Sequence, residues 1–167
     1  MRLREYEAKQ LFRESGIPTP EGKVIRYAEE IFANKIYPCT LKTQVLTGGR
    51  GKLGGIQFAD DPNDAYKKAQ DIFALEIKGD MPEAILVEPK VNIKREIYVS
   101  ILIDRAYRGP IIMAAAEGGV EIESSDSIQI VPITGGNYSS YLGRKMATQL
   151  GLTGKDVLKF GNIVNRI

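Results

Sequence analysis

Apolar residues recur at helical spacing in several segments of the chain. Between 62 and 73 they return every three or four positions, and Asp61 followed by Pro62 is a typical helix start. The same spacing predicts further helices at 3–12, 28–32, 141–150 and 154–167. Helices thus account for much of both halves of the chain.

Other segments are rich in β-branched residues and read as strands. The segment 96–104 places four apolar residues on one side, Ile97, Val99, Ile101 and Ile103. Further strands are predicted at 40–46, 56–60, 84–88 and 110–116. Because two strands are joined by glycines and others by helices, the predicted fold class is α+β with partly antiparallel sheets.

The composition removes several classes of chemistry. None of the 167 residues is histidine, which excludes a Ser-His-Asp or Cys-His nucleophile and an imidazole metal site. The single cysteine, Cys39, cannot form an intrachain disulfide or a four-thiolate metal site, and a buried thiol is expected. Any chemistry must rely on Lys, Arg, Asp, Glu or backbone amides.

Charge and hydropathy limit the partners and the compartment that we expect for the protein. The net charge is +2 with the signs interspersed, so we expect no nucleic-acid partner. The N-terminus lacks the apolar stretch of a signal peptide, and the run IIMAAA at 111–116 is too short to cross a bilayer. We expect a cytoplasmic protein without a membrane partner.

The most unusual stretch is GGRGKLGG at 48–55, in which five of eight residues are glycine. Glycine lets backbone amides turn toward an anion, and Lys42, Arg50 and Lys52 would add positive charge for phosphate oxygens. The stretch matches neither a Walker A motif nor G-x-G-x-x-G before a helix. A flexible hairpin whose cations are merely solvated is the alternative.

Two glutamates stand at strand ends. Glu88 closes the apolar run ILV and could accept bonds from an adenine amino group or ribose hydroxyls, while Glu96 opens the next strand. Each alone is more typical of a solvated carboxylate. The turn EGGVEIE at 117–123 gathers three glutamates, for which a polar turn is preferred over a Mg²⁺ site.

Taken in order, several of these segments resemble the β subunit of succinyl-CoA synthetase, the ADP-forming succinate–CoA ligase. The matching stretches are REYEAKQLFRESGIPTPEG, LKTQVLTGGRGKLGG, ILVE, REIYVSILIDR and AAAEGGVEIE. The resemblance is specific from Met1 to about Glu123 and looser beyond. It implies an ATP-grasp fold, in which two α+β lobes close over a nucleotide.

The resemblance also implies a set of site residues. Lys42 would contact the nucleotide phosphates, and Gly49, Arg50 and Gly51 would form the loop that covers them. Glu88 would lie at the adenine and ribose side, with Val91 offering a main-chain contact and Glu96 a further nucleotide contact. Pro20 would indicate a preference for ATP over GTP. No catalytic or metal-ligating residue is carried over to this chain.

The family reaction joins succinate to coenzyme A with ATP cleavage, as a step of the tricarboxylic acid cycle, through a phosphohistidine on a partner α subunit. The expected cofactors are ATP or ADP and Mg²⁺, and the expected assembly is a heteromer with that subunit. The later Glu-Ile-Asn-Pro strand and the CoA-ligase domain of the family do not occur here, so the lobes are expected to be incomplete and the chain inactive alone.

The resemblance also divides the chain. Residues 1–19 would form a helix on the second lobe, 20–90 the first lobe with the glycine loop, and 91–167 an incomplete second lobe. Two other functions stay open: another ATP-grasp acid–CoA ligase of the malate or acetate type, and a non-catalytic module that binds a partner subunit.

Overall fold

The structure is a computed structural model that describes residues 2–117, 128–133 and 138–167. The chain divides into two compact units, Met1–Asn92 and Ile93–Ile167. The predicted lobe boundary at 90/91 lies two residues before this division. Since the two units are not placed relative to one another, each is described by itself.

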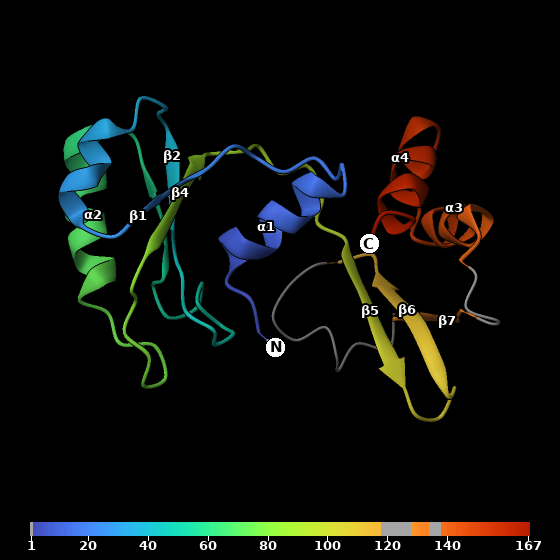
Figure 1. Cartoon of the computed structure of the whole chain (residues 1–167). Helices are drawn as coiled ribbons and strands as arrows, with labels where there is room; N and C mark the ends of the chain where they lie inside the picture. The colour runs from blue at the N-terminus through green and yellow to red at the C-terminus, as the bar shows by residue number, and fades with distance from the viewer. Residues whose placement is uncertain (1, 118–127, 134–137) are drawn as a thin grey trace. The chain divides into compact units, whose positions relative to one another are not determined.

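The first unit is built on a four-stranded antiparallel sheet with the strand order β1-β4-β2-β3 (Figure 1). Its strands are β1 (Lys23–Ile25), β2 (Cys39–Thr43), β3 (Ile56–Ala59) and β4 (Ile85–Pro89). The glycine-rich stretch connects the adjacent antiparallel strands β2 and β3, as the sequence predicts. It is therefore the loop of a β-hairpin.

One face of this sheet carries the core of the first unit. Helix α2 (Pro62–Phe73) and the 3₁₀-helix η1 (Ala28–Ala33) cover it. The Asp61 carboxylate accepts bonds from the amides of Asn63 and Asp64, which caps α2 where the sequence predicts its start. The buried core residues are Ile25, Ala28, Ile31, Cys39, Leu41, Ala59, Ala65, Ala69, Ile72, Ile85 and Val87.

Helix α1 (Glu5–Glu14) lies on the opposite side of the sheet from α2 (Figure 1). None of its residues is fully buried, and its apolar residues Leu11 and Phe12 are exposed. Two charged side chains of this helix, Glu5 and Lys9, form ion pairs with the sheet. How residues 1–19 relate to the second unit stays a prediction.

Two local features of the first unit differ from the sequence-based expectations. Strand β1 is missed, because it has three residues and owes its existence to pairing with β4 rather than to its own pattern. The segment at 28–33 is a 3₁₀-helix, in which Ala28 and Ile31, three residues apart, share the buried side. Phe32 is left outside and stacks on Tyr66.

The second unit combines a three-stranded antiparallel sheet with two helices. The sheet has the order β5-β6-β7, from β5 (Tyr98–Asp104), β6 (Gly109–Ala115) and β7 (Gln129–Pro132). Helices α3 (Ser140–Gln149) and α4 (Lys155–Val164) pack on each other where Gly143 meets Gly161. The shared core consists of Ile112, Ala114, Met146, Ala147, Leu150, Phe160 and Val164.

Two expectations for the second unit need correction. No strand is predicted at 129–132, but these four residues form β7 by pairing with β6. Ile103 does not share the buried side of β5, since it is 75% exposed near the hairpin end of the strand. Most of the turn at 117–123, from Gly118 onward, lies outside the described residues.

Cys39 is fully buried in the first core, as predicted. Burial raises the pKa of its thiol to about 11, so almost no thiolate is present near neutral pH. We expect iodoacetamide to leave the native chain unmodified at about pH 8 and to alkylate it rapidly in denaturant. Equal rates under both conditions, followed by mass spectrometry, would contradict this burial.

No helix among residues 2–117, 128–133 and 138–167 is long and apolar enough to span a membrane.

Candidate functional site

A group of five charged side chains forms the candidate site on the α1 side of the first sheet. Lys42 of β2 and Glu88 of β4 lie on the same face, because Lys42 pairs with Leu86 and Glu88 pairs with Thr40. Their side chains meet diagonally across the strands, with Nζ 2.8 Å from Oε2. The Glu88 side chain is only 2% exposed, so it is not the solvated strand-end carboxylate of the alternative interpretation.

Helix α1 supplies two more members of this group. Glu5 and Lys9 are four residues apart, which places them on one side of the helix, and their charged ends are 2.9 Å apart. The Lys9 ammonium donates to both oxygens of Glu88, at 2.7 Å to Oε2. The Lys42 ammonium also donates to Glu5 Oε1 at 3.1 Å. The two carboxylates and two lysines therefore form a closed network.

The glycine loop supplies the fifth member, Arg50. Its Nη1 donates to the Thr43 carbonyl at 2.9 Å, and its Nη2 donates to Glu5 Oε2 at 3.0 Å. The neighbouring Gly49 has φ +85°, a conformation that glycine adopts without strain. The loop is thus anchored by Arg50 and is more than a solvated hairpin. We name Glu5, Lys9, Lys42, Arg50 and Glu88 the charged cluster.

Gly55 closes the same loop by a tight fit. Its amide donates to the Arg50 carbonyl, and a Cβ at this position would lie 2.5 Å from Thr43 Cγ2 and 3.0 Å from the Arg50 carbonyl oxygen. We expect Gly55→Ala to lower the free energy of unfolding by about 1–3 kcal/mol, because the fully buried Thr43 side chain must shift to make room. The matched control is Gly48→Ala, where a Cβ meets nothing within 4 Å. Equal unfolding midpoints for the two variants would contradict this role.

The charges of the cluster are strongly coupled. Burial alone would raise the pKa of Glu5, but its hydrogen bond with Lys9 and the charges of Lys42 and Lys9 outweigh burial and lower it to about 2. Burial would lower the pKa of Lys42, yet its bond to Glu88 and the charge of Glu5 raise it. Glu5 and Lys42 are accordingly both ionised near neutral pH.

The lowered pKa of Glu5 makes the stability depend on pH. The ordinary value of 4.5 applies to the unfolded chain and about 2 to the folded chain. The stabilisation is therefore complete above about pH 5 and is lost as the pH falls toward about pH 2, by up to about 3 kcal/mol. We expect Glu5→Gln to flatten the pH dependence of the unfolding midpoint in this window. Parallel curves for both proteins would contradict the ion pairs of Glu5.

None of the other predicted residues is a member of the charged cluster. Val91 follows β4 and is 56% exposed, and Pro20 is exposed in the turn before β1. Glu96 is exposed in the second unit, just before β5. Gly51 lies in the glycine loop beside Arg50.

Sequence reasoning missed Glu5 and Lys9. Their only local signal is the i, i+4 spacing of opposite charges in EYEAK, which is typical of any exposed helix. The Glu88 partner of Lys9 is 79 residues away along the chain. Only the fold shows that this helix faces the sheet.

Two small cavities adjoin Glu88. One of about 190 Å³ lies at the end of β4 and is lined by Glu21, Gly22, Lys23, Asn34, Ile36, Val87, Glu88 and Pro89. The other, of about 90 Å³, lies between α1 and the sheet. Gly22 keeps this space open, since a Cβ there would lie 2.9 Å from Glu88 Cγ. Any substitution at Gly22 would press on the cluster.

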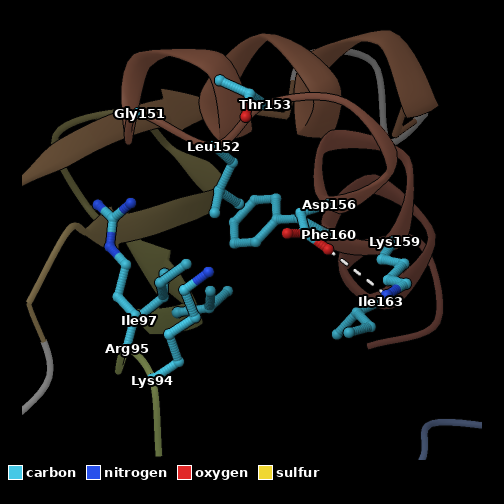
Figure 2. A pocket seen from close by; sticks show the side chains of 11 residues that line it. Lys94, Arg95, Ile97, Gly151, Leu152, Thr153, Asp156, Lys159, Phe160 and Ile163 are labelled. Carbon is cyan, nitrogen blue, oxygen red and sulfur yellow. Dashed lines mark hydrogen bonds and ion pairs between the residues drawn. The ribbon is translucent and has the colours of Figure 1, made fainter.

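A larger cavity of about 650 Å³ lies wholly within the second unit (Figure 2). Apolar side chains of β5 and α4, among them Phe160 and Ile163, form its walls, and Lys94 and Arg95 lie at its edge. Asp156 and Lys159 pair across one turn of α4. None of the predicted site residues lines it.

The model of the ATP-grasp domain family matches residues 2–167. The chain belongs to this family. Its architecture of mixed helices and antiparallel sheets agrees with that membership, and the predicted ATP-grasp fold is confirmed.

Curated relatives confirm the resemblance noted in the sequence. The chain is 48% identical over 124 residues to the "Succinate--CoA ligase [ADP-forming] subunit beta" of Methanocaldococcus jannaschii, which covers 74% of this chain and 34% of the relative. It is 40% identical over 175 residues to the protein of the same name from Methanothermobacter thermautotrophicus, covering 98% and 47%. The chain thus spans about half or less of the length of these relatives.

Solved structures agree on the fold. The Ca. Korarchaeum cryptofilum ACD1 in complex with coenzyme A superposes with a TM-score of 0.72 at 21% identity, over 98% of this chain and 79% of that chain. At this identity the likeness supports the shared fold alone.

Proposed function

We propose that this chain is the nucleotide-binding part of the β subunit of an ADP-forming succinate–CoA ligase, an acid–thiol ligase. The observation that carries the proposal is that Lys42 and Arg50 both donate hydrogen bonds to the Glu5 carboxylate, at the base of the glycine hairpin. Relatives that are 40–48% identical to this chain over the aligned residues bear the name of that ligase.

The phosphate end of the nucleotide is proposed to bind at the glycine loop. Lys42 and Arg50 would donate charge-assisted hydrogen bonds to phosphate oxygens, which are stronger than bonds between neutral groups. Gly49 and Gly51 would allow the loop backbone to approach the phosphates without a Cβ in the way. Positioning and charge stabilisation of this kind are the main contributions of a protein to phosphoryl transfer.

The base end is proposed to lie beside the end of β4. The Glu88 carboxylate is bonded to two lysines, so we assign the contacts of 88–91 with adenine to the main chain, including that of Val91. The cavity of about 190 Å³ beside Glu21 and Pro89 opens at this place. Pro20 precedes that cavity in sequence, and its proposed role is to favour adenine over guanine.

The two compact units are proposed to be the two lobes of the ATP-grasp fold. In that arrangement Glu96, which opens the second unit, would contact the nucleotide from the other side. A helix formed by residues 1–19 would then pack on the second lobe in addition to its ion pairs with the first.

The metal would arrive with the nucleotide. Within the described part of the chain, no group of three or more Asp, Glu or Cys side chains could hold a metal ion. Glu5 and Glu88 are bonded to lysines, so they do not form a ligand set for Mg²⁺. We therefore give Mg²⁺ only as the companion of the nucleotide phosphates.

The chemistry of the acid would require a partner. These 167 residues contain no histidine, and the phosphohistidine is proposed to belong to the ligase α subunit. Coenzyme A and succinate would bind to the whole heteromeric complex, in the cytoplasm and without nucleic acid or membrane. An acid–CoA ligase of the malate or acetate type is the second candidate, since the cluster contacts nucleotide and does not select the acid.

Calorimetric titration of the 167-residue chain tests the proposal. We expect Mg-ADP to bind with a dissociation constant at or below the millimolar range and more tightly than Mg-GDP. Absence of ADP binding at millimolar concentration would contradict the nucleotide site. A stable complex with a candidate α subunit, combined with that absence, would favour a non-catalytic interaction module.

A further inference from the structure

We infer that Glu5 is a positioning residue of the proposed nucleotide site, whose carboxylate holds the Lys42 ammonium and the Arg50 guanidinium together for one phosphate group. The inference rests on the proposed function and adds to it a residue of α1 that lies outside the predicted set.

The two oxygens of Glu5 are divided between two separate elements. Oε1 accepts from Lys42 on β2, and Oε2 accepts from Arg50 in the glycine loop. The Arg50 guanidinium also donates to the Thr43 carbonyl at the end of β2. Without the Glu5 charge, two cations would repel each other and the loop would lose its attachment to α1.

Both cations keep donors for a ligand while they contact Glu5. An ammonium has three N–H donors and a guanidinium has five. In the described residues, Lys42 donates to two carboxylates and Arg50 to one carbonyl and one carboxylate. The remaining donors fit a phosphate group that adds to Glu5 rather than replacing it.

Lys9 completes the arrangement from the same helix. It donates to both oxygens of Glu88 and lies 2.9 Å from Glu5 Oε1. Lys9 and Lys42 therefore share the single negative charge of Glu88, which does not fully neutralise Lys42. The cluster of three cations and two carboxylates keeps a surplus of one positive charge, which suits an incoming anion.

A competing role for Glu5 predicts the opposite change in nucleotide affinity. If the carboxylate occupied the phosphate position, it would compete with the nucleotide, and removal of its charge would tighten binding. A positioning role predicts weaker binding on the same change.

The test compares Glu5→Gln with wild type in the full 167-residue chain. We expect ADP affinity to fall about tenfold, the loss of one charge-assisted contact, while adenosine affinity, followed by NMR titration, is unchanged. The matched control is Glu14→Gln, on the same helix but outside the charged cluster and bonded to Gln10, which should leave both affinities unchanged. An unchanged or tighter ADP affinity in Glu5→Gln, or an equal loss for adenosine, would overturn the inference.

Limited trypsin cleavage of the nucleotide-free chain separates this inference from the proposed function. We expect cleavage after Arg50 to be faster in Glu5→Gln than in wild type or Glu14→Gln, because the guanidinium is released. Wild type could fail to bind ADP while Glu5→Gln is still cleaved faster after Arg50. That result would contradict the nucleotide site but support the attachment of the loop by Glu5. Equal cleavage rates in the three proteins would contradict the attachment of the loop to Glu5 through Arg50.

Discussion

Lys42→Met is expected to weaken binding of Mg-ADP by about 10- to 100-fold. The ammonium contributes charge-assisted hydrogen bonds worth about 1.5–3 kcal/mol, and its removal also leaves Glu5 and Glu88 with less positive charge around them. Both effects disfavour an incoming phosphate. Calorimetric titration of the variant beside wild type measures the change.

The matched control for this change is Lys68→Met. Lys68 also forms an ion pair, with Asp64 on α2, but it lies outside the charged cluster. The control should bind Mg-ADP as wild type does. Thermal unfolding of each variant shows whether a loss of binding arises from a loss of folding. Wild-type affinity in a folded Lys42→Met chain would remove Lys42 from the site.

Glu88→Gln is expected to have the largest effect on stability, a loss of about 2–4 kcal/mol in the free energy of unfolding. Its carboxylate is bonded to Lys9 and Lys42, and removing one partner of a buried ion pair leaves the others uncompensated. The neutral amide retains the shape of the side chain, so the change reports mainly on charge. Urea unfolding at neutral pH measures it.

Glu83→Gln is the control for this second change. Glu83 pairs with Arg4, but its side chain is 68% exposed, and an exposed pair contributes little, about 0–1 kcal/mol. If Glu88→Gln were no more destabilising than Glu83→Gln, the buried network would not contribute to the stability of the first unit.

The local parts of this fold are those that the sequence predicts well. The start of α2 depends on Asp61 and Pro62 alone, because a cap involves only neighbouring residues. Strands β1 and β7 are short, and each is stabilised by a partner strand distant in the sequence. No pattern within three or four residues can contain that information.

The same distinction applies to the candidate site. The glycines mark the loop, and Lys42 and Arg50 are close to it in sequence, so composition alone draws attention to them. From the sequence alone, Glu88 is expected to be a solvated carboxylate. Its burial is tolerable only because Lys9 and Lys42 neutralise its charge. Since these partners come from α1 and β2, the burial of Glu88 follows only from the tertiary structure.

The position of bound nucleotide is the most direct test of the proposed site. Amide chemical shifts of the ¹⁵N-labelled chain during titration with Mg-ADP would locate it residue by residue. We predict that the largest shifts occur in β2 and the glycine loop, at Lys42 and Gly49–Gly51, with smaller shifts near Val91. Shifts confined to the cavity of the second unit, around Leu152 and Phe160, would contradict a phosphate site at the charged cluster.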